Sequence, residues 1–218
     1  MAAPFILASS SPRRRALLTE AGYDFEVVVP AISELAIAQL SLHELTIANA
    51  TRKARAVARS HRGRVVLAAD TLVAMEGEII GKPRTLAHAR MILRRLSGRT
   101  HEVCTAVCIV DPRGTINFTE LSQVRFRRLT EEAITNYFKT VNPIDKAGAY
   151  AAQGAGGRII ASVKGSVTNV IGLPMERTRK ALAQIDIRPL SASRLQLPGA
   201  ALELALAHVS IPDKETRQ

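Results

Sequence analysis

The segment Phe5-Ile-Leu-Ala-Ser-Ser-Ser-Pro-Arg-Arg-Arg15 combines an apolar run, a serine loop and the start of a helix. The four apolar residues 5–8 have the length of a short buried strand. Pro12 suits the first position of a helix, where its missing N–H is not needed, and Ser11 suits the N-cap before it. A helix is expected over residues 13–21. This segment therefore predicts a strand, a loop and a helix in succession.

The loop and the first helical turn of this unit carry groups that bind anions. A helix N-terminus presents unpaired backbone N–H groups and a partial positive charge. Serine hydroxyls and guanidinium groups add hydrogen-bond donors at the same place. The predicted phosphate ligands here are Ser9, Ser11, Arg13 and Arg14. A capped surface helix with a solvated basic turn explains this segment equally well when it is taken alone.

The rest of the chain alternates between strand and helix patterns. Strands are predicted at residues 26–29, 65–69, 102–110, 115–126 and 159–163, with a hairpin turn around Gly77. Helices are predicted at residues 42–61, 86–96, 131–138 and 175–185. Such alternation predicts an α/β or α+β fold built around a sheet.

The composition is that of a globular protein with an excess of positive charge. The 218 residues include 30 Lys and Arg against 19 Asp and Glu, a net charge of +11, and 47% of them are hydrophobic. Nucleic acid, a membrane surface or a phosphate-bearing substrate would each suit this charge. Aromatic residues make up only 4% of the chain and Trp is absent, which leaves little material for base stacking. Much of the charge is expected on solvated helix faces, as at Arg55, Arg59, Arg90 and Arg94.

Cellular location and cysteine chemistry are read from the same sequence. No apolar stretch reaches the roughly 18 residues that a membrane helix needs, and basic residues follow the first apolar run instead of preceding it as in a signal peptide. We therefore expect a soluble cytoplasmic protein with no membrane partner. Cys104 and Cys108 are expected to be core thiols, because their spacing in a strand cannot close a zinc site.

Asp70 is a charged residue that directly follows the apolar run of residues 65–69. A carboxylate in or at the end of a buried strand is costly unless it binds a metal, pairs with a cation or transfers protons. Capping of a turn is the structural alternative. Glu34 is an isolated acid near another strand end, so it is the second predicted ligand of a hard cation. A plain surface position is the alternative for Glu34.

Two lysines and a glycine-rich loop complete the candidate site. Lys53 lies on the predicted helix 42–61, and Lys82 lies in the turn Gly81-Lys-Pro83, which can aim an ammonium group into a cleft. Exposed surface lysines are the ordinary alternative. A polar, glycine-rich loop of the kind that lines ligand pockets adds Asp145, Lys146 and Gln153. The Walker pattern and the dinucleotide-binding glycine pattern are both absent from the sequence.

Taken in order along the chain, these segments resemble the Maf family of nucleoside triphosphate pyrophosphatases. The matching pieces are Leu7-Ala-Ser-Ser-Ser-Pro-Arg-Arg14, Glu34, Lys53-Ala54, Ala69-Asp-Thr71, Gly81-Lys-Pro83, Leu96-Ser-Gly98 with His101 and Thr105, Asp145-Lys-Ala-Gly-Ala-Tyr150, Gln153, and Asn169-Val-Ile-Gly-Leu-Pro174. The resemblance implies a mixed twisted sheet flanked by helices, folded as two lobes around a central cleft in the manner of Maf and ITPase proteins. It implies one catalytic domain over residues 1–189. Residues 190–218 are then a C-terminal extension with a candidate helix at residues 200–209 and no assigned chemistry.

The resemblance also implies metal-dependent cleavage of a nucleoside triphosphate to the monophosphate and pyrophosphate. Asp70 would be the general base, and Glu34 with Asp70 would hold a divalent cation, Mg²⁺ or Mn²⁺. The implied phosphate ligands are Ser9, Ser11, Arg13, Arg14, Lys53 and Lys82, and the further pocket residues are Asp145 and Lys146.

Three positions indicate the branch of the family that acts on dTTP and UTP. Members of that branch are similar to this chain in having Arg13 after the proline, Thr71 after the aspartate, and Gln153. The branch that acts on 7-methyl-GTP tends to have Trp, Gln and Glu at these positions. A glutamine both donates and accepts hydrogen bonds, which suits the edge of uracil or thymine. These three residues are therefore the predicted specificity residues.

The predicted partner is a small nucleoside triphosphate, with no stable nucleic-acid partner and, by resemblance alone, a homodimer. The alternative function is a non-catalytic regulator of cell division that binds nucleotides or nucleic acid, since the family has been associated with septum formation. Such a binder has no need of Asp70, Glu34 and two lysines in this arrangement. The sequence therefore favours the enzyme. Hydrolysis of modified pyrimidine nucleotides as housecleaning is a third possibility, which differs from the enzyme above only in its substrate.

Overall fold

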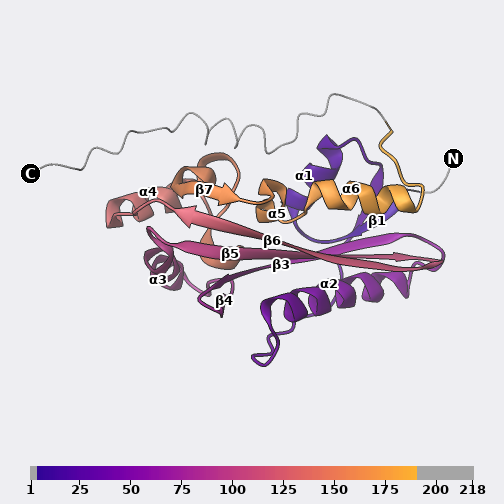
Figure 1. Ribbon diagram of the computed structural model, residues 1–218, viewed down its shortest axis with the longest axis horizontal. Coiled ribbons are helices and arrows are strands. Elements are labelled where there is room, and N and C mark those ends of the chain that lie inside the picture. The colour runs from indigo at the N-terminus through magenta and orange to yellow at the C-terminus, as the bar shows by residue number, and fades with distance from the viewer. Residues whose placement is uncertain (1–3, 191–218) are drawn as a thin grey trace, which may run out of the picture.

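A seven-stranded mixed sheet forms the centre of the fold (Figure 1). The structure is a computed structural model that describes residues 4–190. The strands are β1 (Phe5–Ala8), β2 (Phe25–Val28), β3 (Val66–Met75), β4 (Glu78–Ile80), β5 (Thr100–Asp111), β6 (Gly114–Phe126) and β7 (Ile160–Lys164). Their order is β2-β1-β3-β5-β6-β7, with β4 pairing β3. β1 is parallel to β2 and β3, whereas the other pairs are antiparallel, so the predicted mixed sheet is confirmed.

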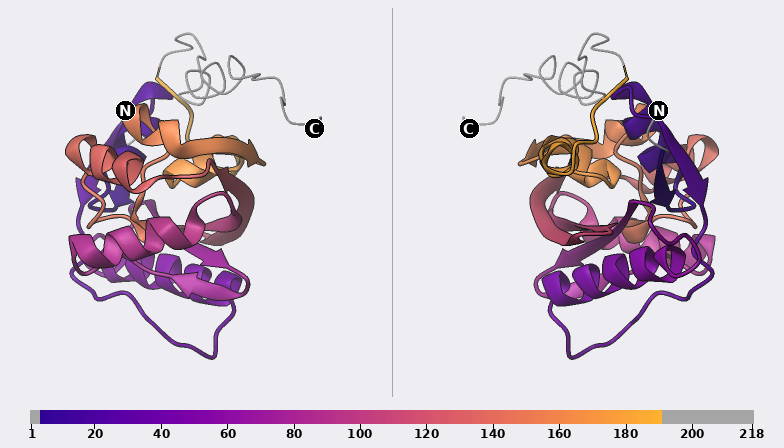
Figure 2. Two further views of the ribbon diagram at one scale, coloured as in Figure 1. Left: turned by 90° about the vertical axis from the view of Figure 1, so that its left-hand side faces the viewer. Right: turned by 90° about the vertical axis from the view of Figure 1, so that its right-hand side faces the viewer.

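Helices lie on both faces of the sheet. They are α1 (Pro12–Glu20), α2 (Leu42–Ala58), α3 (Leu86–Leu96), α4 (Glu131–Thr140), α5 (Val167–Ile171) and α6 (Met175–Gln184), with two 3₁₀ segments, η1 (Ala147–Ala149) and η2 (Gly154–Ile159). In Figures 1 and 2, α2 runs along one face, and α1, α5 and α6 lie on the other. The α/β class and the flanking helices are therefore confirmed. The division into two lobes stays a prediction.

Alternation along the central strands divides the core into two layers. The layer next to α2 is formed by Ile6, Ala8, Ala50, Ala54, Val57, Val66, Ala68, Ala106 and Cys108. The opposite layer includes Phe5, Leu7, Leu17, Leu18, Leu67, Ala69, Val107 and Ile109. Successive side chains of a strand point to opposite faces. Asp70 therefore continues the series that faces α2, and Thr71 continues the series that faces α1.

The middle of β3 has a neighbouring strand along one edge only. β5 pairs with residues 66–74 along that edge. On the opposite edge, and within the described residues, β1 pairs with residues 66 and 67 and β4 with residues 73–75. Residues 68–72 are therefore left without a strand partner there. This opening places Asp70 beside the serine loop that follows β1.

Capping side chains fix the starts of α1 and α2, the two helices next to the opening in the sheet. The Ser11 hydroxyl accepts a hydrogen bond from the Arg14 N–H at 3.5 Å, and Pro12 is the first residue of α1, as the sequence predicted. At α2, the Ser41 hydroxyl accepts from the Glu44 N–H, and the Glu44 carboxylate accepts from the Ser41 N–H. This reciprocal capping box stabilises the start of the helix that carries the candidate lysine.

Some predicted boundaries were wrong. The strand predicted at residues 65–69 continues to Met75, because Thr71 and the apolar residues after it also pair with β5. The helix predicted to residue 61 ends at Ala58. The helix α5 was not predicted, since five residues are too few to show a helical period. The candidate helix at residues 200–209 lies outside the described residues, and the domain boundary at residue 189 stays a prediction.

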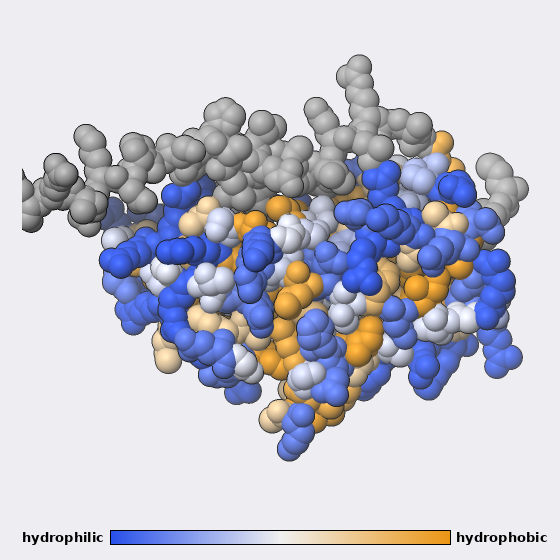
Figure 3. All heavy atoms as spheres, in the orientation of Figure 1, coloured by the Kyte–Doolittle hydropathy of each residue, from blue (hydrophilic) through white to orange (hydrophobic). Residues whose placement is uncertain are grey.

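Hydrophilic side chains cover much of the surface seen in Figure 3. Arg55, Arg59 and Arg94 are exposed, as predicted for solvated helix faces. Arg90 is half-buried and forms an ion pair with Glu131. A substantial part of the net charge is therefore ordinary surface charge.

The structure also bears on the two cysteines and on membrane-spanning helices. Cys104 and Cys108 are both buried and unpaired, which confirms them as core thiols. Between residues 4 and 190, none of the helices has both the length and the apolar character that crossing a bilayer requires.

Candidate active site

A cavity of about 530 Å³ lies at the opening in the sheet. The predicted site residues that line it are Ser9, Ser11, Arg13, Arg14, Glu34, Lys53, Asp70, Thr71, Lys82, Asp145 and Lys146. They come from the loop after β1 and from α1, from the segment before α2, from α2 and β3, and from the loops after β4 and α4. The fold therefore brings together in one cavity residues that lie far apart in the sequence.

Gln153 is the one predicted site residue that is not part of this lining. Its side chain is half-buried, and its backbone carbonyl accepts a hydrogen bond from the Gly156 N–H at 3.1 Å. Ala151 and Ala152, directly before it, do line the cavity. Its place in specificity stays a prediction.

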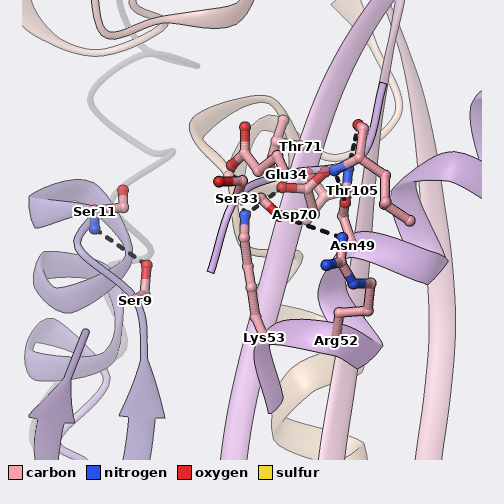
Figure 4. A network of polar contacts seen from close by, with 12 residues as sticks. Ser9, Ser11, Ser33, Glu34, Asn49, Arg52, Lys53, Asp70, Thr71 and Thr105 are labelled. Carbon is pink, nitrogen blue, oxygen red and sulfur yellow. Dashed lines mark hydrogen bonds and ion pairs between the residues drawn. The ribbon is translucent and has the colours of Figure 1, made fainter. Parts of the chain in front are cut away.

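Lys53 lies between two carboxylates (Figure 4). Its Nζ donates to Asp70 Oδ1 at 2.5 Å and to Glu34 Oε1 at 2.7 Å. Asp70 is only 2% exposed, and a charge at such depth needs a partner of opposite sign. The other oxygen, Asp70 Oδ2, is buried and has no hydrogen-bond partner among the described residues. Because a buried acceptor without a donor is costly, a hydrogen bond from a water or a ligand to Oδ2 would be favourable.

Glu34 links the two lysines of the site. Lys82 Nζ donates to Glu34 Oε2 at 3.1 Å, while Lys53 occupies Oε1. Burial raises the pKa of the Glu34 carboxyl, but the hydrogen bond from Lys53 and the charges of both lysines lower this pKa to about 2. Glu34 is therefore an anion at neutral pH.

The segment that carries Glu34 has no regular structure, and α2 holds it in place. Asn49 Oδ1 accepts from the Leu35 N–H at 2.7 Å, and the Asn49 amide donates to the Leu35 carbonyl at 3.3 Å. Arg52 Nη1 donates to the backbone carbonyl of Ser33, the residue before Glu34, at 3.2 Å. Asn49 lies three residues before Arg52 and four residues before Lys53, so it is a neighbour of both on the helix surface. Sequence reasoning missed Asn49 and Arg52, although the spacing of four residues between Asn49 and Lys53 was an available signal.

Arg14 connects three parts of the chain on the opposite side of β3. Its Nε donates to the Gly172 carbonyl at 2.8 Å, Nη2 to Thr71 Oγ1 at 3.0 Å, and Nη1 to Ser9 Oγ at 3.3 Å. Burial lowers the pKa of this guanidinium, whose ordinary value is high enough that it stays charged. Because a guanidinium has five N–H donors and three are used here, two are left for a ligand.

Arg13, Asp145 and Lys146 form another part of the lining. Arg13 Nη1 lies 3.7 Å from Asp145 Oδ2, a loose ion pair, and Lys146 Nζ donates to Asp145 Oδ1 at 2.5 Å. Burial raises the pKa of the Asp145 carboxyl, but the hydrogen bond from Lys146 and the charges of Lys146 and Arg13 together lower it by more. The pKa of Asp145 therefore lies below its ordinary value. Arg13 is therefore more available to an anion than the firmly bound Arg14.

Tyr150 also lines the cavity, and His101 holds it from below the surface. His101 Nε2 lies 2.9 Å from the Tyr150 hydroxyl, and the two rings meet edge to face. Burial lowers the pKa of His101 to about 4, so the imidazole is neutral at pH 7. Next to this pair, the Tyr137 hydroxyl accepts from the Ala151 N–H at 3.0 Å. These buried aromatic residues shape the wall of the cavity, a role that the sequence patterns did not predict.

Together, the sheet and this cavity define an α/β protein whose pocket surrounds a buried carboxylate with cations and suits a small polyanion. Residues 4–185 match the family described as Maf-like protein, and the chain belongs to this family. The resemblance stated from the sequence motifs is thereby confirmed.

Three bacterial proteins that are similar to this chain over most of its length are each named dTTP/UTP pyrophosphatase. The chain is 48% identical over 188 residues to the dTTP/UTP pyrophosphatase of Akkermansia muciniphila, which covers 86% of this chain and 100% of that protein. It is 44% identical over 182 residues to the dTTP/UTP pyrophosphatase of Bacillus cytotoxicus, covering 84% and 95% of the two chains. It is 45% identical over 181 residues to that of Salmonella typhimurium, covering 83% and 92%.

Proposed function

We propose that the protein is a nucleoside triphosphate pyrophosphatase that hydrolyses dTTP and UTP to the nucleoside monophosphate and pyrophosphate. The observation that carries this proposal is the buried Asp70, which lines a cavity together with lysines and arginines and whose Oδ2 has no hydrogen-bond partner among the described residues. The relatives named dTTP/UTP pyrophosphatase, at 44% to 48% identity, support the substrate class.

The cationic lining suits a triphosphate. Arg13 and Lys82 are loosely held or partly exposed and are available to phosphate oxygens. Ser9 and Ser11 lie at the N-terminus of α1, where hydroxyl and backbone N–H groups are further donors. Phosphoryl transfer depends mainly on positioning and on stabilising negative charge, so this lining would supply much of the catalysis.

In this proposal Asp70 acts as the general base. Lys53 holds Oδ1, which leaves Oδ2 to accept a hydrogen bond from the attacking water. As the water oxygen bonds to phosphorus, its proton passes to Oδ2 and the anhydride bond between the α- and β-phosphates breaks. Pyrophosphate leaves with the electron pair of that bond, and the proton later returns to solvent.

A divalent cation, Mg²⁺ or Mn²⁺, fits the donors of this site. Glu34 and Asp70 supply carboxylate oxygens, the ligands that such cations prefer, and Asp70 Oδ2 lacks a partner among the described residues. Within residues 4–190 no group of three or more His, Cys, Asp or Glu side chains is arranged to hold a metal, so waters and substrate phosphates would supply the other ligands. When bound, the cation would lower the pKa of a water and neutralise phosphate charge.

Base selection is assigned to Arg13, Thr71 and Gln153. Thr71 and Arg13 line the cavity, and Gln153 follows directly after residues that do. A homodimer, a cytoplasmic location and the absence of a stable nucleic-acid partner are further predictions of the same proposal.

A substrate panel tests this function. Purified protein with Mg²⁺ or Mn²⁺ is expected to release pyrophosphate from dTTP and UTP faster than from dATP or 7-methyl-GTP, and a chelator is expected to stop the release. A preference for 7-methyl-GTP would reject the assigned branch. Salt-dependent binding to DNA or RNA without any pyrophosphate release would favour the non-catalytic regulator instead.

A further inference from the structure

Thr71 and Thr105 are direct cross-strand partners on β3 and β5. Their hydroxyl oxygens lie 2.9 Å apart, and Thr105 is fully buried. Thr105 Oγ1 also lies 2.9 Å from the backbone carbonyl oxygen of Asn169, and Arg14 Nη2 lies 3.0 Å from Thr71 Oγ1. Arg14, Thr71, Thr105 and the Asn169 carbonyl therefore form one continuous chain of hydrogen bonds.

Both ends of this chain fix the direction of every bond in it. A carbonyl oxygen can only accept, so Thr105 must donate its single hydroxyl proton to Asn169. Thr105 then has to accept from Thr71, which commits the only hydroxyl proton of Thr71. At the other end a guanidinium can only donate, so Thr71 Oγ1 accepts from Arg14.

The anchor of the chain cannot easily move. The Asn169 amide donates to the Val103 carbonyl at 3.0 Å and to Ser122 Oγ at 2.9 Å, and the Asn169 N–H donates to Ser166 Oγ at 3.1 Å. These bonds hold Asn169 against β5, so its backbone carbonyl cannot turn away from Thr105. The direction in which the Thr71 hydroxyl donates is therefore set by Thr105 and Asn169, two buried residues that are not part of the cavity lining.

A consequence follows for any ligand in the cavity. Thr71 is half-buried and lines the cavity, but it has no proton left to donate and one lone pair left to accept. The oxygens of an ionised triphosphate are acceptors only, so Thr71 cannot bind them. The ligand group that meets Thr71 must carry a hydrogen-bond donor.

We propose that Thr105 is a positioning residue that, by committing the Thr71 proton, makes Thr71 an acceptor for the imide N3–H of uracil or thymine. This inference rests on the proposed hydrolysis of UTP and dTTP. Cytosine has an unprotonated N3, an acceptor, which would face the Thr71 oxygen unfavourably. Thr105 therefore favours UTP over CTP without contacting either nucleotide.

The variant Thr105→Val tests this, because valine keeps the shape and removes the hydroxyl. The freed Thr71 proton can then turn towards the ligand, and the ratio of kcat/KM for UTP over CTP is expected to fall about threefold to tenfold, the effect of one hydrogen bond. Thr105→Ser restores the hydroxyl and is expected to recover most of the ratio. The matched control is Thr178→Val, since Thr178 is buried in α6 and donates only to the Pro174 carbonyl.

The possible outcomes separate this inference from the proposed function. Absence of UTP hydrolysis by the unaltered protein would reject the proposed function itself, and with it this inference. Normal UTP hydrolysis with an unchanged UTP-to-CTP ratio in Thr105→Val would overturn the role of Thr105 alone. If Thr105→Val does not fold, Thr105→Ala replaces it in the same comparison, because alanine also removes the hydroxyl. A fall of threefold or more in the UTP-to-CTP ratio supports the proposal, and a smaller change overturns it.

Discussion

Asp70 and Thr71 are neighbours on β3, yet their side chains enter two different environments. Asp70 belongs to an ionic cluster of Glu34, Lys53, Asp70 and Lys82 on the side of α2. Thr71 belongs to a hydroxyl clamp of Arg14, Thr71, Thr105 and the Asn169 carbonyl on the side of α1. The two groups are separated by the thickness of a single strand, because consecutive side chains of a strand face opposite ways.

The two groups differ in how completely their atoms are bonded. The ionic cluster leaves one buried carboxylate oxygen without a donor, an expensive arrangement in a folded protein. The hydroxyl clamp commits both of its hydroxyl protons to protein acceptors. Chemistry is therefore expected from the ionic cluster, and orientation and selectivity are expected from the hydroxyl clamp. Four substitutions test this division.

The largest effect is expected on stability from Lys53→Met. Removing the ammonium leaves the buried Asp70 carboxylate without its partner, and loss of one member of a buried pair costs about 3–5 kcal/mol. Urea unfolding measures this loss. The exposed pair Lys180 and Glu176 provides the control, since Lys180→Met is expected to change the free energy of unfolding by less than about 0.5 kcal/mol. Adding Asp70→Asn to Lys53→Met should recover much of the loss, and no recovery would contradict a buried charge pair.

The next effect is expected on turnover from Asp70→Asn. An amide cannot take the proton of water, so kcat is expected to fall by about 100-fold or more. This corresponds to about 2.7 kcal/mol in the activation barrier. Pyrophosphate release under saturating UTP measures it, with the exposed Asp24→Asn as control. Hydrolysis close to that of the unaltered protein would reject Asp70 as the base.

A smaller effect is expected from Arg14→Lys in the hydroxyl clamp. Lysine keeps the charge but cannot reach Gly172, Thr71 and Ser9 together, so stability is expected to fall by about 1–2 kcal/mol. KM should rise more than kcat falls, because the clamp orients the site and does not transfer the proton. Thermal unfolding and steady-state kinetics measure both, with the exposed Arg15→Lys as the control. A loss confined to kcat would place Arg14 with the chemistry instead.

The smallest effect is expected from Glu34→Gln, and it depends on pH. The folded pKa of Glu34 is about 2, below its ordinary value of 4.5, so its stabilising contribution is fully present above pH 4.5. That contribution is lost as pH falls from 4.5 towards 2. Because the Glu34 side chain is 39% exposed, its contribution to the free energy of unfolding is expected to be below about 1 kcal/mol. The difference in Tm between the unaltered protein and the variant should therefore narrow in acid, and a constant difference from pH 7 to pH 3.5 would contradict the ionic cluster.

Local sequence patterns were sufficient for the elements that depend on near neighbours. The strand, serine loop and capped helix at residues 5–20 were predicted because proline and serine act on the adjacent backbone. The five-residue helix α5 was not, since its position comes from contacts with β5 and β6. Asn49 and Arg52 were missed for a related reason, as their partners lie in an irregular segment.

The sequence by itself determined the residue types of the candidate site and the family, while the extension of β3 through Asp70 and Thr71 became clear only in the structure. Only the tertiary structure decided which atoms are left free. Lys53 donates a hydrogen bond to one oxygen of Asp70, and Thr105 accepts the hydrogen bond of the Thr71 hydroxyl. Both contacts join residues at least 17 positions apart. Hydrogen-bond direction depends on both ends of a chain of contacts, and a local pattern contains only one end.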